Sequence, residues 1–240
     1  MKKKVYIVDA SRTAGASLGK TLKDISAVDL GSCVIANTIK KNNIDSSDID
    51  EVIMGQVLTG GSGQNPARQA SIKAGLPIEI PAYIVNQVCG SGLRSIAAGY
   101  QSIKAGEAKI IIAGGQENMS LAPHAIHLRN GKKLGDKKLT DTMIQDGLWD
   151  AFNEYHMGVT AENVAEKFQV TREEQDKFAL SSQEKALKAQ KENKFKDEII
   201  NFKIKSKKTE IDFNKDEHPR EGINLETLSR LKPAFKNDGT

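Results

Sequence analysis

The run AKIIIAGG at residues 108–115 constrains the fold more than any other feature of the sequence. Apart from Lys109 it holds only apolar or small residues. A strand that lacks polar alternation is buried on both of its faces. The sequence therefore predicts a sheet that helices cover on both sides.

Further strand and helix patterns precede this run. Strands are predicted at KVYIVDA (4–10), at EVIMGQVL (51–58) and in the segment that ends at Cys89. Apolar and small residues from Ala27 to Thr38 recur at i, i+3, i+4 and i+7, which predicts a helix that ends near Asn42. Helical spacing from Leu93 to Ile103, before Gly106, predicts a second one. Strand, Cys-Gly-Ser-Gly turn, helix and strand together form a βαβ unit of an α/β fold.

The sequence changes character after GGQENMS (114–120), because charge rises and long apolar runs disappear. We place a boundary here, between a domain at 1–118 and an α+β subdomain at 119–240. In the second part Thr160 is the predicted N-cap of a helix. TREE (171–174) is a capping box that begins a charged helix. Alternating apolar residues at 200, 202 and 204 predict a half-exposed strand.

Composition excludes several classes of function. The chain has 240 residues, a formal net charge of +4 and few aromatic residues, which does not favour nucleic-acid binding. No segment approaches the roughly 20 apolar residues that span a bilayer, so we expect no membrane partner. Two cysteines form neither a disulfide framework nor a C-x-x-C zinc pattern. A free thiol fits a reducing compartment, and we expect the cytoplasm.

Cys89 is the strongest candidate for chemistry. It lies on a turn from a strand into a helix, where the helix N-terminus stabilises a thiolate, free amides can hold an oxyanion, and Gly90 and Gly92 leave room for a substrate. A buried core cysteine is an equally good interpretation from placement alone. A third interpretation takes GSGLRS (90–95) as an approximate dinucleotide fingerprint, with Glu117 as its ribose contact.

The other candidates carry weaker signals. His124 and His127 are spaced i, i+3 but lack the acidic residue of a zinc enzyme, so no metal site is predicted. His156 and Met157 are taken by default as core residues, and Cys33, in the middle of a helix, as a packing residue.

Several stretches together resemble the thiolase family, in the order and at the distances that family shows. They are GQNPARQASIKAGLP (63–77), NQVCGSGLRSI (86–96), AGGQENMS (113–120), MGVTAENVA (157–165) and LKPAF (231–235). The resemblance runs the full length of the chain. It implies a thiolase-like layered domain with a mixed sheet between helices, and a loop subdomain that serves coenzyme A binding and assembly.

The resemblance also implies an activity. Cys89 matches the cysteine that takes the acyl group from an acyl-CoA, after which a second acetyl-CoA is deprotonated and attacks the thioester. Acetoacetyl-CoA and free CoA result, or acetyl-CoA forms by the reverse thiolysis, without a metal or cofactor beyond the coenzyme A thioesters. His156 and Met157 match residues that line the acyl and pantetheine pocket. Leu148 and Arg220 match positions near the CoA nucleotide.

The chain departs from the family in one respect. A second half that supplies a histidine, a further cysteine and an asparagine to the site is absent, and the sequence stops at NDGT. We therefore expect the N-terminal part of a longer enzyme that is inactive or severely impaired alone. We expect a tetramer when the enzyme is whole, since 119–145 resembles the family's assembly loop. The alternatives are a ketoacyl synthase-type condensing enzyme and a catalytically silent chain that only folds and associates.

Overall fold

The computed structural model describes residues 4–129, 131, 133–205 and 209–240. The chain forms two compact units. Unit 1 is Met1–Gly147 with Glu198–Asn214, and unit 2 is Leu148–Asp197 with Lys215–Thr240. The predicted boundary after residue 118 lies inside unit 1 and does not coincide with the division between the units. A functional division at that point stays a prediction.

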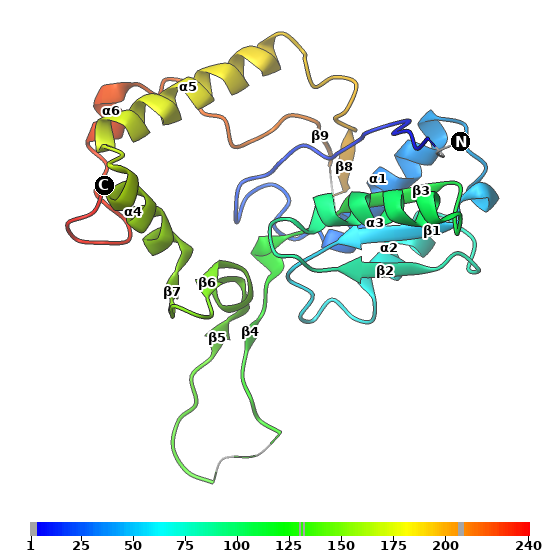
Figure 1. Cartoon of the computed structure of the whole chain (residues 1–240), viewed down its shortest axis with the longest axis horizontal. Helices are drawn as coiled ribbons and strands as arrows, with labels where there is room; N and C mark the ends of the chain where they lie inside the picture. Colours follow the sequence, from blue (N-terminus) through cyan, green and yellow to red (C-terminus); the bar gives the residue numbers. More distant parts are fainter. Residues whose placement is uncertain (1–3, 130, 132, 206–208) are drawn as a thin grey trace. The chain divides into compact units, whose positions relative to one another are not determined.

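Unit 1 contains a three-stranded sheet, its helices and two antiparallel ribbons (Figure 1). Its elements are α1 (Ala27–Lys41), β1 (Glu51–Gly55), α2 (Pro66–Lys73), β2 (Ala82–Val85), α3 (Ser91–Ala105), β3 (Ile111–Gly115), β4 (His124–Ala125), β5 (Thr140–Asp141), β8 (Phe202–Lys205) and β9 (Glu210–Phe213). Short helical turns lie at Ser46–Asp48 and Met119–Leu121, and a π-helical turn, Met143–Leu148, ends at the first residue of unit 2.

The central sheet has the strand order β2-β1-β3, and both neighbours run parallel to β1. Gly55, the last residue of β1, is in register with Val85 of β2 and with Gly115 of β3. The carboxyl ends of the three strands therefore lie at one edge of the sheet. The predicted βαβ unit is confirmed, with α3 between β2 and β3.

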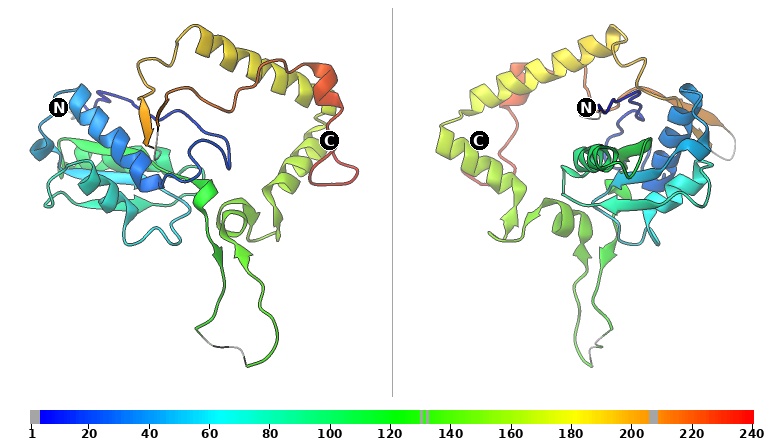
Figure 2. Two further views of the ribbon diagram at one scale, coloured as in Figure 1. Left: turned by 180° about the vertical axis from the view of Figure 1, so that it is seen from behind. Right: turned by 45° about the vertical axis from the view of Figure 1, so that its right-hand side comes forward.

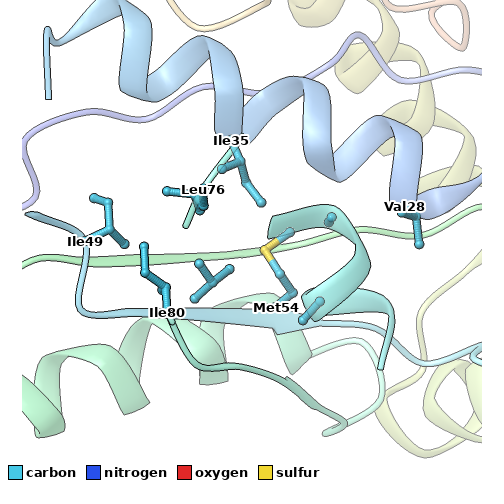
Figure 3. Close-up of a cluster of buried hydrophobic side chains, with 9 residues drawn as sticks. Val28, Ile35, Ile49, Met54, Leu76 and Ile80 are labelled. Atoms are coloured by element: carbon cyan, nitrogen blue, oxygen red, sulfur yellow. The ribbon is translucent and has the colours of Figure 1, made fainter. Parts of the chain in front are cut away.

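Helices cover both faces of this sheet at β1, as predicted. The apolar run itself is less buried than expected, since β3 is partly buried from residue 111 to 114 and exposed at Gly115. Val52 and Met54 of β1 belong to a buried cluster that includes residues of α1 and α2 (Figure 3). Side chains alternate along a strand, so Ile53 and Gly55 point to the opposite face. Gly55 lies against the first turn of α3, which contacts β1 and β3, and Ile53 is fully buried.

The packed surface of α3 is made of small residues. Its buried positions are Ser91, Ser95 and Gly99, spaced four residues apart, which let the helix approach the strands closely. The apolar residues that predicted the helix lie elsewhere, since Leu93 is 74% exposed and Tyr100 is 51% exposed. The helix itself is confirmed, and Gly106 ends it in the left-handed conformation.

The predicted strand at 4–10 is wrong. In the part of the chain that the structure describes these residues belong to no strand, and Tyr6, Ile7 and Val8 are each more than 70% exposed. The apolar and β-branched composition gives the segment strand propensity. A strand also requires a hydrogen-bonding neighbour, and propensity does not supply one.

The β8–β9 ribbon packs on the N-terminal segment, which Figure 2 shows from two sides. Phe202 and Phe213 form a second buried cluster with Ala14 and Leu22. Backbone bonds join Arg12 to residues 198 and 200. The alternation predicted around residue 202 is confirmed as β8.

Unit 2 is mainly helical. Its elements are β6 (Trp149–Asp150), β7 (Tyr155–His156), α4 (Met157–Phe168), α5 (Arg172–Lys191) and α6 (Leu225–Ser229). The predicted capping box is confirmed, because Thr171 and Glu174 exchange side-chain and backbone bonds at the start of α5. The cap predicted at Thr160 is wrong, since α4 begins three residues earlier, where the ring of His156 accepts the bond from Gly158.

No helix among the described residues is both long enough and apolar enough to cross a membrane.

Candidate functional site

Cys89 lies on the turn between β2 and α3, at the carboxyl edge of the sheet. Its side chain is exposed, which contradicts the interpretation as a buried core cysteine. Cys33, by comparison, is partly buried against the second cluster of unit 1, and burial raises the pKa of its thiol. Of the two thiols, Cys89 is therefore the accessible one.

The turn around Cys89 is held by side chains as well as by backbone. The Gly90 amide donates to the Gln87 carbonyl oxygen at 3.0 Å, and the Val88 amide donates to Asn86 Oδ1 at 2.9 Å. The Ser91 hydroxyl accepts from the Gln87 amide at 2.8 Å and donates to the Val88 carbonyl oxygen at 2.6 Å. These bonds fix the backbone on both sides of the cysteine.

The helix that follows Cys89 begins directly on the sheet. A Cβ atom at Gly55 would collide with the backbone of Ser91 and Gly92, and one at Gly115 would lie 3.4 Å from the Gly92 Cα atom. Glycine is required at Gly55 because two backbones meet there. Sequence reasoning gave Gly55 no role. Its signal is a glycine inside a strand pattern, which marks a close backbone approach.

Glu117 lies at the same edge, two residues beyond β3. Its carboxylate accepts bonds from the Val57 amide at 2.8 Å and from the Leu58 amide at 3.2 Å. Burial raises the pKa of this carboxyl group, and the two amide bonds partly oppose that rise. The dinucleotide interpretation assigns the Glu117 carboxylate to a ribose. In the structure this carboxylate instead binds the backbone amides that follow β1.

The remaining predicted site residues belong to unit 2. Trp149 of β6 is paired with His156 of β7 in an antiparallel ribbon. Leu148 directly precedes β6 and Met157 directly follows β7, so the ribbon brings Leu148, His156 and Met157 to the same end. Met157 is 44% exposed, which contradicts the default of a core residue.

His156 has two defined contacts. Its Nδ1 atom accepts the Gly158 amide bond at 2.9 Å, so in the neutral ring the proton is on Nε2. Phe235 stacks on the ring with centroids 5.0 Å apart. A Cβ atom at Gly158 would collide with the Phe235 ring. The LKPAF motif includes Phe235, but sequence reasoning gave that residue no role.

Arg220 lies on a different segment of unit 2. The Arg220 amide donates to Gln183 Oε1 on α5 at 2.9 Å, and Gln190 of the same helix donates to the Asp216 carbonyl oxygen at 2.9 Å. The side chain of Arg220 is exposed. Arg220 is thus not part of the Leu148, His156 and Met157 group.

Within the described ranges, no group of three or more histidine, cysteine or acidic residues could hold a metal ion. His124 lies near one carboxylate, with Nε2 3.8 Å from Asp141 Oδ2 across the β4–β5 pair.

The comparisons with known proteins agree with one another. The family model for the N-terminal domain of thiolase matches residues 5–240. A curated acetyl-CoA acetyltransferase of Pseudomonas aeruginosa is 54% identical over 238 residues, 98% of this chain and 61% of the relative. A probable acetyl-CoA acyltransferase of Staphylococcus aureus is 51% identical, over 99% of this chain and 61% of the relative.

A solved structure gives the same result. The crystal structure of the Bacillus anthracis acetyl-CoA acetyltransferase aligns with a TM-score of 0.93 and 37% identity, over 97% of this chain and 59% of that chain. The likeness confirms the thiolase-like α/β fold. The chain spans about 60% of the length of these relatives.

Proposed function

The chain belongs to the thiolase family, and we propose on that basis that it is an acyl-CoA C-acyltransferase with Cys89 as its covalent nucleophile. The observation that carries the proposal is an exposed thiol on a rigid turn between a strand and a helix, in a chain that matches the thiolase family model over residues 5–240. Residues 86–89 of this turn are exposed, so a substrate can reach the thiol from solvent.

The chemistry proceeds in two acyl transfers. The Cys89 sulfur attacks the carbonyl carbon of acetyl-CoA, a new carbon–sulfur bond forms, and CoA leaves with the proton of the thiol. A second acetyl-CoA then loses a methyl proton, and its carbon attacks the S-acetyl group. Acetoacetyl-CoA forms and Cys89 is released as a thiol. The first transfer exchanges one thioester for another. The second forms a carbon–carbon bond while the carbon–sulfur bond to Cys89 breaks, and thiolysis is the same sequence in reverse.

Residues of unit 2 support the binding of coenzyme A in this proposal. Met157 and the Phe235 ring provide apolar surface for the acyl and pantetheine chain, beside Leu148. Because His156 Nδ1 accepts a backbone bond, its Nε2–H group is the one that can donate to a ligand. Arg220 carries a permanent positive charge, which suits the phosphates of the nucleotide.

The proposed substrates and products are acetyl-CoA, acetoacetyl-CoA and CoA, without a metal or cofactor. The named activity of the acetyltransferase relatives supports acetyl-CoA, and a reducing cytoplasm would keep Cys89 as a thiol. We also propose a homotetramer for the full-length protein, on the resemblance of 119–145 to the family's assembly loop. Sedimentation equilibrium of the full-length protein tests that assembly, and a monomer at every concentration would contradict it.

Mass spectrometry tests the nucleophile. Intact protein is mixed with acetyl-CoA, quenched in acid and weighed, and the modified peptide is located by digestion. We expect one acetyl group on the peptide that holds Cys89, its loss in Cys89→Ala, and its retention in Cys33→Ala. An acetyl group elsewhere, or an adduct that survives Cys89→Ala, would overturn the proposal.

A further inference from the structure

The Ser91 side chain binds both backbone segments that flank Cys89. Its hydroxyl accepts from the Gln87 amide at 2.8 Å and donates to the Val88 carbonyl oxygen at 2.6 Å, so one oxygen atom closes the turn. Ser91 is 4% exposed, and its backbone rests directly on Gly55 of β1. A buried hydroxyl with both bonds satisfied holds its partners rigidly.

The residue that Ser91 binds is strained. Val88 has a φ angle of 48°, in the left-handed region that a β-branched residue avoids. The other non-glycine residues with positive φ among those described are asparagine, glutamate or glutamine, which are not β-branched. A strained conformation persists only where surrounding contacts enforce it. At Val88 those contacts are Asn86 Oδ1 at its amide and, at its carbonyl oxygen, the Ser91 hydroxyl at 2.6 Å and the Ser91 amide at 3.1 Å. The hydroxyl bond is the shorter of the two, and it is the one that a substitution at Ser91 removes.

We propose that Ser91 is a positioning residue for Cys89. This inference rests on the proposed role of Cys89 as nucleophile. The hydroxyl keeps Val88 in its strained conformation, and the sulfur of the next residue is thereby held at the start of α3. There the unpaired amides of the helix favour negative charge on the attacking atom. Without the hydroxyl, Val88 relaxes toward a negative φ angle, and Cys89 turns away from the helix.

Ser95 provides a matched control one turn further along α3. Its hydroxyl is also buried and also has two partners, since it lies 2.7 Å from the carbonyl oxygens of both Gly92 and Gly114, which share its single proton. Ser95 fastens the helix to β3 and makes no bond to residues 86–89. Removal of either hydroxyl costs comparable stability, but only that of Ser91 frees the turn.

The test is the alkylation rate of Cys89 by iodoacetamide, measured by peptide mapping so that Cys33 is counted separately. The sulfur displaces iodide and loses its proton, so the rate reports the nucleophile without any acyl-CoA. We expect Ser91→Ala to slow alkylation of Cys89 roughly fivefold or more. Ser91→Thr, which keeps a hydroxyl, and Ser95→Ala should stay within about twofold of wild type. Circular dichroism and urea unfolding confirm that each variant is folded.

Equal rates in folded Ser91→Ala and wild-type protein would overturn the inference, as would equal slowing by Ser91→Ala and Ser95→Ala. Failure of the proposed function gives a different result, namely no acetyl group on Cys89 of the wild-type protein, whatever the alkylation rates. If Ser91→Ala does not fold, Ser91→Gly and Asn86→Ala release the same turn. Unchanged rates in those variants contradict the inference equally.

Discussion

Gly55 is where the backbone of a strand and the backbone of a helix meet below the reactive cysteine. We predict that Gly55→Ala destabilises the protein by about 1–3 kcal/mol, because the new methyl group collides with the backbone of Ser91 and Gly92, which cannot move independently of α3. Urea unfolding measures the change. Gly114→Ala is the control, since its Cβ atom would meet only the Met54 sulfur at an ordinary 3.9 Å. Equal losses in the two variants would contradict the prediction.

Glu117 gives the stability of unit 1 a defined dependence on pH. Burial raises its folded-state pKa above the ordinary value of 4.5, so the folded protein holds this proton more tightly than the unfolded chain. The stabilising contribution is complete below pH 4.5 and is lost as the pH rises through the folded pKa. Relative to Glu117→Gln, the wild-type free energy of unfolding should therefore fall with rising pH.

Urea unfolding at a series of pH values from 4.5 upward measures this difference. The comparison with Glu117→Gln removes the contribution of other carboxyl groups, including Glu51, whose pKa burial also raises. A difference that is constant with pH, or that grows in favour of the wild type, would show that Glu117 has no raised pKa in the folded state.

At the scale of elements, the start of α4 depends on His156 in two separable ways, as a cap and as a stacking partner of Phe235. We predict that the free energy of unfolding of His156→Asn is about 1 kcal/mol higher than that of His156→Ala, because asparagine can accept a hydrogen bond from the Gly158 amide and alanine cannot. Both variants lose the ring contact. Equal stability of the two variants in urea unfolding would mean that the Nδ1 bond contributes nothing.

The order of strands and helices in unit 1 could be predicted from sequence patterns, because AKIIIAGG and EVIMG are short, largely apolar runs typical of buried strands and the residues of α1 have helical periodicity. Two predictions failed for identifiable reasons. Residues 4–10 have strand composition but no neighbouring strand to pair with. Thr160 is a residue type that often caps helices, but α4 begins before it and is capped by the ring nitrogen of His156. In α3 the helix was predicted from its exposed apolar residues, while its buried contacts are serines and a glycine.

The site was partly predictable in the same way. Cys89 stood out because a reactive residue on a strand-to-helix turn leaves a local signal. The β6–β7 ribbon that groups Leu148, His156 and Met157 consists of two residues per strand, too short for any periodicity. Gly55, Ser91 and Phe235 act through contacts with residues distant in sequence or through a single hydroxyl, which a linear pattern does not reveal.

At the scale of the whole molecule, the chain leaves unit 1 after residue 147 and returns to it at residues 198–214. A single boundary in the sequence does not describe such a return. The return depends on contacts of Phe202 and Phe213 with residues near position 14, which are distant in sequence. We predict that Phe213→Ala costs unit 1 about 3–5 kcal/mol. Hydrogen exchange should quicken in β8 and in α1, and stay unchanged in α5.

Phe178→Ala is the control for that experiment, since this phenylalanine lies on α5 and is 78% exposed. It should leave exchange in unit 1 at the wild-type rate. Faster exchange in α5 than in β8 after Phe213→Ala would contradict the assignment of residues 198–214 to unit 1.

The central claim is that Cys89 carries an acyl group between coenzyme A molecules. The most direct measurement mixes the protein with acetyl-CoA and isotopically labelled CoA and follows labelled acetyl-CoA. It forms faster than by uncatalysed thioester exchange when a protein group accepts the acetyl group and returns it to the other CoA. Because this chain alone is expected to be severely impaired, the account predicts slow but measurable exchange by the wild-type protein and by Cys33→Ala, and none above background by Cys89→Ala. Exchange that persists in Cys89→Ala, or its absence in wild-type protein that binds acetyl-CoA, would contradict it.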